Sequence, residues 1–297
     1  MTTPELSVVI PSVNGLGDLI GCVDAVLAQR EAVLEVLVMD RCGEAVRAEV
    51  RRRFPTVRVF AAPADTTIPD LRQQAFAAAT GDFVAVIEDH VVVPPRWAHD
   101  LLAAQRAVGG VVGGAIENAA TERLVDWAAF LCEYSHCIPP LPSGPTTSVT
   151  GNNVIYPRTL LERHRNVLGG GRWENQLHDA LVRDGVLLTC RPEIVVGHKK
   201  HYTVWEYLSQ RYLYARSYAG ARLAGASLPR RLAFAAASFA LPPLLFYRTV
   251  SRVMAKRRHR RELLRSLPLL ALFVTSWAWG EVVGSAAGPG DSLARVC

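Results

Sequence analysis

Short β-branched runs alternate with helix-like stretches over the first 115 residues. The runs are LSVVIPS, LEVLVMD, VRVFAA and DFVAVIED, and residues 18–29 and 68–80 are two of the stretches between them. This alternation is typical of a parallel sheet with helices on both faces. Ligands of such sheets bind beyond the carboxyl ends of the strands. The sequence places Ser12, Asp40 and the segment 88–90 there, so we expect an α/β fold with its site at that edge.

Three glycines follow the first run, and an acid ends the second. Gly15, Gly17 and Gly21 together with Asp40 approach the layout of a dinucleotide-binding βαβ unit, which would indicate an oxidoreductase. In that fold, however, the first glycine stands directly at the strand end. Here residues 11–14 intervene, and the spacing is GxGxxxG. The oxidoreductase therefore remains an alternative that the spacing disfavours.

The run DFVAVIEDH ends in two carboxylates and an imidazole, on Glu88, Asp89 and His90. Adjacent polar groups at the end of a buried strand are costly unless they have a partner. A divalent cation that holds a diphosphate needs only one or two protein ligands, because water and phosphate oxygens supply the rest. The pattern therefore favours a cation site over a solvated turn before Pro94.

The C-terminal third is basic and apolar. The chain has a formal charge of +6, and the block KRRHRR covers residues 256–261 between two apolar segments, 232–250 and 267–283. A basic block beside apolar segments favours an anionic membrane surface over nucleic acid as the partner. The segments have 19 and 17 residues, and Pro242 and Pro243 interrupt the first. Two spanning helices are one possibility. A re-entrant or interfacial hairpin is the expectation we prefer, since it keeps the basic loop on the cytosolic face.

The order of the motifs resembles that of the family 2 glycosyltransferases, in particular the membrane-associated bacterial type. The chain has a first strand that ends in VVIPSVN, a second that ends in Asp40, and the segment DLRQQAFAAATGDFVAVIED with Arg72. Residues 88–90 take the place of the family's Asp-x-Asp element. The resemblance covers residues 6–220. It implies a GT-A-type nucleotide-diphospho-sugar transferase fold, an α/β fold with a mostly parallel sheet flanked by helices.

The resemblance also implies a donor site and a metal site. The donor-binding residues would be Pro11, Ser12, Asn14, Asp40, Arg72, Glu88 and Asp89. The metal ligands would be Glu88, Asp89, His90 and His198. His90 departs from the family pattern because an acid is usual at its position. The expected cofactor is a divalent cation, Mn²⁺ or Mg²⁺. Imidazole suits Mn²⁺ better than Mg²⁺, so His90 puts the family's preference between the two ions in doubt.

The segment RWENQLHDALVRDG, residues 172–185, resembles the family's acceptor-side element. Glu174 occupies the position of the catalytic base at a helix start, and Trp173 stands where a second acid is usual. A base is needed because the acceptor hydroxyl loses its proton as it attacks the sugar. Asp179, one turn further along, is the rival base. The remaining residues on the acceptor and diphosphate side would be Asn152, Asn153, Trp173, Gln210 and Arg211.

We therefore expect a catalytic domain over residues 1–225 and a membrane-associated helical hairpin and tail over residues 226–297. The expected reaction is inverting, metal-dependent sugar transfer from a nucleotide diphosphate donor at the cytoplasmic face of the cell membrane. The acceptor would be lipid-linked or a polysaccharide, as in the making of cell envelope polysaccharide, and nucleic acid is not an expected partner. The main alternative is a catalytically degenerate, glycosyltransferase-like membrane scaffold. A sugar nucleotidyltransferase is disfavoured, because the Gly-rich, arginine-bearing loop of that class is absent after the first strand.

Overall fold

The computed structural model describes residues 4–29, 32, 34–167 and 172–297. The chain divides into two compact units, each built from two separate stretches. The first unit comprises Met1–Ala119 and Cys137–Lys199, and the second comprises Ala120–His136 and Lys200–Cys297. The predicted domain boundary at residue 225 thus lies within the second compact unit, and the functional division at that residue stays a prediction.

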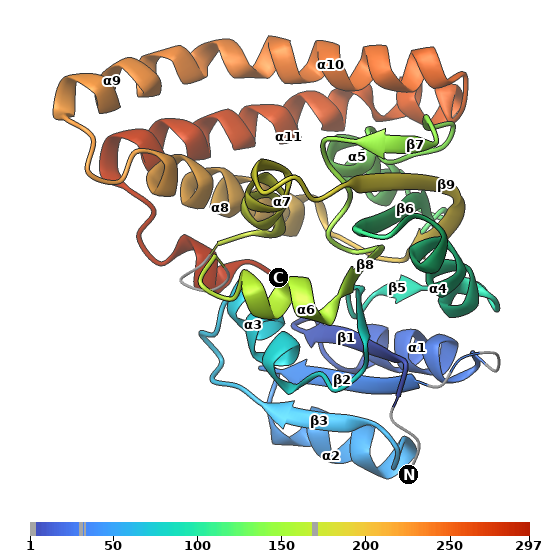
Figure 1. Cartoon of the computed structure of the whole chain (residues 1–297). Helices are drawn as coiled ribbons and strands as arrows, with labels where there is room; N and C mark the ends of the chain where they lie inside the picture. Colours follow the sequence, from blue (N-terminus) through green and yellow to red (C-terminus); the bar gives the residue numbers. More distant parts are fainter. Residues whose placement is uncertain (1–3, 30–31, 33, 168–171) are drawn as a thin grey trace. The chain divides into compact units, whose positions relative to one another are not determined.

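The first unit contains the sheet. Its strands are β1 (Leu6–Ser12), β2 (Leu34–Asp40), β3 (Arg58–Ala61), β4 (Phe83–Val86), β5 (Val91–Val92), β6 (Val111–Asn118), β7 (Gly144–Thr146), β8 (Val154–Pro157) and β9 (Leu188–His198). Its helices are α1 (Leu16–Leu27), α2 (Glu44–Arg53), α3 (Ile68–Ala78), α4 (Trp97–Val108), α6 (Arg158–Arg163) and α7 (Glu174–Arg183). Figure 1 shows these elements in sequence colours.

The sheet is mixed, with strand order β3-β2-β1-β4-β8-β6-β9-β5 and β7 paired to β9. Strands β3, β2, β1 and β4 run parallel, as the alternating pattern predicts. Strand β8 enters antiparallel between β4 and β6, and β9 is parallel to β6. The predicted α/β fold with a central, helix-flanked sheet is confirmed, and the antiparallel strands belong to its second half.

Local sequence explains where the first helices begin. All seven residues of β1 are buried, and the strand is accordingly mostly apolar and without charged residues. Gly15 then adopts φ 90° as the N-cap of α1, a conformation that favours glycine. At the start of α3, the Thr67 hydroxyl accepts a hydrogen bond from the Asp70 backbone N–H, and Pro69 occupies the first turn. Of the three glycines, Gly15 begins α1 beyond the strand end, and Gly17 and Gly21 lie within that helix.

The second unit is helical. It contains α5 (Leu124–Tyr134), α8 (Val204–Arg222), α9 (Leu228–Ala237), the 3₁₀ turn η1 (Ser238–Ala240), α10 (Leu241–Lys256), α11 (Arg260–Ala287) and the 3₁₀ turn η2 (Ser292–Arg295). Helix α11 packs against α8, α5, α10 and α9. A Cβ atom at Gly280 or Gly284 of α11 would collide with backbone oxygens of α8, so these two glycines permit the close approach of the two helices.

The apolar segments of the tail are helical over longer stretches than the sequence pattern predicts. Residues 228–256 and 260–287 are each long and apolar enough to cross a membrane by length and composition. Pro242 and Pro243 lie in the first turn of α10, directly after the 3₁₀ turn, where proline is tolerated. In the most apolar window of each stretch, 17% of the first and 39% of the second is buried. Spanning and interfacial arrangements both remain compatible with these helices.

Candidate active site

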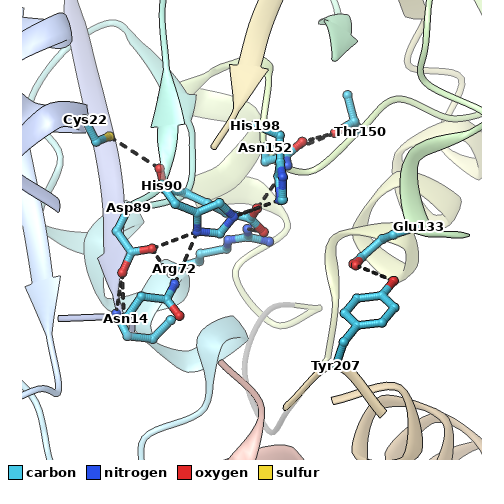
Figure 2. A network of polar contacts seen from close by, with 12 residues as sticks. Asn14, Cys22, Arg72, Asp89, His90, Glu133, Thr150, Asn152, His198 and Tyr207 are labelled. Atoms are coloured by element: carbon cyan, nitrogen blue, oxygen red, sulfur yellow. Dashed lines mark hydrogen bonds and ion pairs between the residues drawn. The ribbon is translucent and has the colours of Figure 1, made fainter. Parts of the chain in front are cut away.

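Three side chains converge beyond the carboxyl end of β4. Glu88 and His90 lie between β4 and β5, and His198 is the last residue of β9. Figure 2 shows His90 and His198. The Nε2 atom of His90 lies 2.9 Å from Nε2 of His198 and 3.3 Å from Oε2 of Glu88. The antiparallel pairing of β5 with β9 places Val91 opposite His198. This pairing brings together two histidines that are 108 residues apart in the sequence.

Asp89 is turned away from this group and holds the first loop. One carboxylate oxygen accepts hydrogen bonds from the backbone N–H groups of Val13 and Asn14, at 2.8 and 2.9 Å. The other oxygen accepts one from the Asn14 side chain at 2.6 Å and lies 3.0 Å from Nδ1 of His90 (Figure 2). A carboxylate on Nδ1 orients the ring so that Nε2 faces Glu88 and His198. The structure therefore places Asp89 behind His90, as a support.

The charges in this group favour a cation. Burial opposes ionisation of Glu88, but the contacts with His90, Arg72 and His198 outweigh it and hold the pKa of the Glu88 carboxyl well below its usual value. Burial would lower the pKa of His90, yet Asp89 and Glu88 overcome it and raise this pKa to about 9. Two ionised carboxylates thus face one imidazole. The negative field that retains a proton on His90 would equally attract a metal ion.

The donor set fits a divalent metal. One ligand atom each from Glu88, His90 and His198 lies within 4.8 Å of the others. Two imidazole nitrogens and one carboxylate oxygen suit Mn²⁺ and other first-row divalent ions better than Mg²⁺, which prefers oxygen ligands. Three of the four predicted metal ligands therefore share one location.

Arg72 connects this group to the predicted base. Its guanidinium lies 3.3 Å from Oε1 of Glu88 and also forms an ion pair with Glu174, the first residue of α7. Arg72 is buried on α3. A Cβ atom at Gly151 would lie only 3.1 Å from Oε2 of Glu174 and 3.3 Å from Nη1 of Arg72. The predicted base and the predicted metal ligands are therefore neighbours in one buried network.

The two asparagines before β8 have different surroundings. The side-chain amide of Asn152 donates a hydrogen bond to Oε2 of Glu88 at 3.0 Å. Its side-chain oxygen accepts a hydrogen bond from the Thr150 hydroxyl (Figure 2). Asn153 is fully buried and accepts from the indole N–H of Trp97 at 2.9 Å. Its amide donates to backbone oxygens of β6 and to Ile194 of β9. Asn152 therefore joins the site, whereas Asn153 ties β8 to its neighbouring strands.

Pro11, Ser12 and Asp40 lie at the carboxyl ends of β1 and β2, as predicted. The Ser12 hydroxyl donates to Oδ1 of Asp40 at 2.8 Å, and Arg47 of α2 lies 3.0 Å from Oδ2. The Asp40 carboxylate also accepts hydrogen bonds from the backbone N–H groups of Cys42 and Gly43, in the turn that begins α2. The buried Asp40 therefore organises this strand end through Ser12 and Arg47.

The other predicted residues lie in two places. Trp173 is buried and is the N-cap residue of α7, directly before Glu174. Gln210 and Arg211 belong to α8 in the second unit. Gln210 exchanges two hydrogen bonds with Cys297, and the Arg211 guanidinium stacks 4.1 Å from the ring centroid of Trp277. Their predicted contact with the diphosphate stays a prediction.

A buried pair next to the predicted base is not apparent from the sequence. The Tyr156 hydroxyl of β8 lies 2.7 Å from Nε2 of His178 on α7, and the two rings stack with centroids 5.9 Å apart. Both side chains are buried. The signal that could have found His178 is its spacing, since a residue four positions after Glu174 lies on the same helix face.

This pair makes a pH dependence testable. Burial lowers the pKa of His178 from 6.5 to about 4, with Asp179 opposing and Arg72 assisting, and Nε2 of His178 is hydrogen-bonded to the Tyr156 hydroxyl. Unfolded His178 takes up a proton as the pH falls below its ordinary pKa, whereas folded His178 does so only near pH 4. We therefore expect this group to cost roughly 3 kcal/mol of folding stability between pH 6.5 and 4, and nothing above pH 6.5.

The measurement is the free energy of unfolding of the full chain in detergent at a series of pH values. The control is the double variant Tyr156→Phe/His178→Leu, in which the titrating group is absent. Below pH 6.5 the unfolding free energy of this variant should fall less steeply with decreasing pH, by the slope that corresponds to about one proton. Equal slopes in both proteins would refute the assignment.

The comparisons with known proteins identify the family. Residues 7–163 match the family Glycosyl transferase family 2, and this region is more than half of the chain. No protein of curated function matches the sequence. The chain belongs to glycosyl transferase family 2 and is a sugar-transferring enzyme of the GT-A fold. This assignment replaces the oxidoreductase alternative.

Solved structures of low sequence identity share the fold. S. aureus TarS 1-349 in complex with UDP-GlcNAc has a TM-score of 0.52 at 12% identity, over 94% of this chain and 91% of that one. The mannosyltransferase PcManGT from Pyrobaculum calidifontis, in complex with GDP-Man and Mn²⁺, has 0.53 at 17% identity, over 93% and 88%. In a longer TarS structure the match spans 39% of the TarS chain.

Proposed function

We propose that the enzyme transfers a sugar from a nucleotide diphosphate donor to an acceptor hydroxyl, with inversion at the anomeric carbon and with a divalent cation as cofactor. The observation that carries the proposal is the position of Arg72 between Glu88 and Glu174. A single side chain, Arg72, thus links the carboxylate of Glu174, which is suited to act as a base, to Glu88, which belongs to a group suited to hold a metal and a diphosphate.

Glu88, His90 and His198 would hold the cation. When bound, a divalent cation neutralises the charge of the leaving diphosphate. Asn14, held by Asp89, and the strand ends at Ser12 and Asp40 would contact the nucleotide. Arg72 would add a positive charge on the diphosphate side. The bound cations and nucleotide sugars in the related structures are properties of those proteins, and they support this proposal by analogy.

Glu174 would act as the base. It accepts the proton of the acceptor hydroxyl as that oxygen bonds to the anomeric carbon, and the bond from this carbon to the diphosphate breaks. The start of a helix favours the ionised carboxylate. In the structure this carboxylate is paired with Arg72, so the acceptor hydroxyl must replace that contact. Asp179, the rival base, is exposed one turn further along α7.

The direct test is a screen of nucleotide diphosphate sugars for diphosphate release with a mixture of lipid-linked and polysaccharide acceptors. We expect release with at least one donor, and expect it to stop in EDTA and return with Mn²⁺. Binding of nucleotide sugars without any release would favour the degenerate scaffold. Release that is unaffected by EDTA would remove the metal from the proposal.

We further propose that the second unit binds the cytoplasmic face of the cell membrane. Helix α9, the turn η1 and helix α10 expose large apolar side chains, with Leu232 52% exposed, Phe239 68% and Tyr247 70%. Trp279 on α11 is 56% exposed. Apolar side chains together with cations are the composition of an interfacial membrane helix. The exposed cations of this region are Arg230, Arg248, Arg257, Arg258, Arg260, Arg261 and Arg265.

The packing of α11 supports an interfacial arrangement over a spanning one. Its inner face contacts α8 and α5, and buried Glu281 forms an ion pair with Arg222 of α8. A helix that packs against several neighbouring helices and buries an ion pair has less of its surface free for lipid than a span surrounded by lipid on all sides. A membrane-bound enzyme would also be well placed for a lipid-linked or surface polysaccharide acceptor.

A single cysteine decides the topology. In a chain without its native cysteines, Arg258→Cys in the loop between α10 and α11 should resist an impermeant thiol reagent on intact cells. It should react after permeabilisation. The matched control keeps only the native, exposed Cys42 of the first unit, which should behave in the same way. Labelling of Arg258→Cys but not of Cys42 from outside would mean that the helices span the membrane.

A further inference from the structure

The hydrogen bond between Tyr156 and His178 lies in a mainly apolar part of the core, next to the ion pair of Arg72 with Glu174. Val154, Leu161, Leu177 and Leu181 belong to the same hydrophobic cluster as Tyr156. The tyrosine is 0% exposed and the histidine 2%. Burying two polar side chains gains little net stability, and removal of one leaves the other unsatisfied. Such a pair fixes the position of α7 relative to β8, because the hydrogen bond forms at only one register of the helix against the strand.

The strand that carries Tyr156 also reaches the metal-side group. Asn152, two residues before β8, donates to Glu88 at 3.0 Å. Tyr156, four residues later, holds His178 of α7, and Glu174 is one turn before His178 on the same face of that helix. One short segment, residues 152–156, therefore contacts both the carboxylate that would hold the cation and the helix that carries the base.

The ion pair between Glu174 and Arg72 cannot hold α7 in place during the reaction. Glu174 must exchange Arg72 for the acceptor hydroxyl before it can accept a proton. The contact of Tyr156 with His178 involves neither reacting group, so it persists through that exchange. It is a polar contact of α7 that remains in place while the carboxylate changes partner, and the pairing of His164 with Asp184 holds the C-terminal end of the helix.

We propose that Tyr156 and His178 are positioning residues, which hold α7 against β8 so that the carboxylate of Glu174 stays in line with the donor site. This inference rests on the proposed role of Glu174 as the base. Burial holds the pKa of His178 at about 4 and raises that of the Tyr156 hydroxyl well above its usual value. Both side chains are therefore neutral at physiological pH, and the pair is a fixed hydrogen bond.

The test is Tyr156→Phe, which removes one oxygen and keeps the ring. We expect kcat at saturating donor and acceptor to fall about tenfold or more, because a misplaced base lowers the rate of the chemical step. The Kd of the nucleotide diphosphate in Mn²⁺ should stay within about twofold, because the groups that would bind it are unchanged. An unchanged kcat, measured well below the melting temperature of the variant, would overturn the proposal.

A second variant separates position from stability. Tyr156→Phe/His178→Leu leaves no unsatisfied polar group, so its melting temperature should recover towards the wild-type value. Its kcat should stay low, since the directional contact is missing. Recovery of kcat together with stability would show that packing alone suffices and would refute the positioning role. This variant also provides folded protein for the measurement if Tyr156→Phe is unstable.

The control for general destabilisation is Leu161→Val, in the same cluster but on α6. It should lower the melting temperature and leave kcat unchanged. The two proposals fail in different ways. Retained turnover in Glu174→Gln refutes the base, whereas full kcat in Tyr156→Phe beside an inactive Glu174→Gln refutes the positioning role alone.

Discussion

Replacing Glu174 with glutamine should lower turnover by about a hundredfold or more while nucleotide binding survives. The substitution keeps the shape of the side chain and removes its ability to accept a proton. Glutamine can still donate to or accept from its neighbours, so α7 should keep its place. The measurement is kcat with the donor found in the screen, together with the Kd of the nucleotide diphosphate by calorimetry.

The matched control is Asp179→Asn on the same helix. Asp179 is exposed, whereas Glu174 is buried against Arg72. We expect the control to keep at least about half of the wild-type rate, since an exposed carboxylate away from the network has no proton to accept. If Glu174→Gln were active and Asp179→Asn inactive, the base would have to be reassigned to Asp179.

The second large effect concerns the metal. His90→Ala should weaken Mn²⁺-dependent binding of the nucleotide diphosphate by more than tenfold, or about 1.4 kcal/mol. The variant loses one of three clustered ligands, and Asp89 loses the ring that it supports. The same loss should appear in the wild-type enzyme when EDTA is in excess.

A surface histidine provides the control for this experiment. The side chain of His99 on α4 is 41% exposed and lies outside the ligand group. His99→Ala should bind nucleotide as the wild type does, with the same requirement for Mn²⁺. Nucleotide affinity that is the same with and without EDTA would contradict the metal site, whatever the behaviour of the variants.

The strand ends could be predicted because local sequence determines them. The runs that end at Ser12 and Asp40 are mostly apolar and each finishes at a polar residue, where the structure ends β1 and β2. By contrast, the meeting of His90 with His198 depends on strand pairing across 108 residues. The number of residues between His90 and His198 carries no information on how far apart the two side chains lie in the fold. Only the resemblance to a family indicated that both belong to one site.

The orientation of neighbouring side chains was harder to predict than their location. Asn152 and Asn153 look equivalent in the sequence, yet the first reaches Glu88 and the second is enclosed between strands. Asn152 and Asn153 lie in the turn and bend that precede β8, so no strand alternation fixes which side chain faces the site. Asp89 and His90 likewise lie in a turn, in which the backbone N–H of Val91 donates to the carbonyl oxygen of Glu88. The different directions of Glu88, Asp89 and His90 therefore depend on the geometry of this turn, which the sequence does not show.

The discontinuous second unit bears on how the protein is made. Helix α5 is synthesised long before α11, yet Ala128 and Ala129 of α5 share a hydrophobic cluster with Tyr207 of α8 and Phe273 of α11. A recombinant chain that stops at residue 225 would contain α5 and α8 without the helix that covers them. It would carry an apolar surface in place of a core and would tend to aggregate during expression. A shortened enzyme for crystallisation should therefore keep α11 and remove only exposed apolar side chains from α9 and α10.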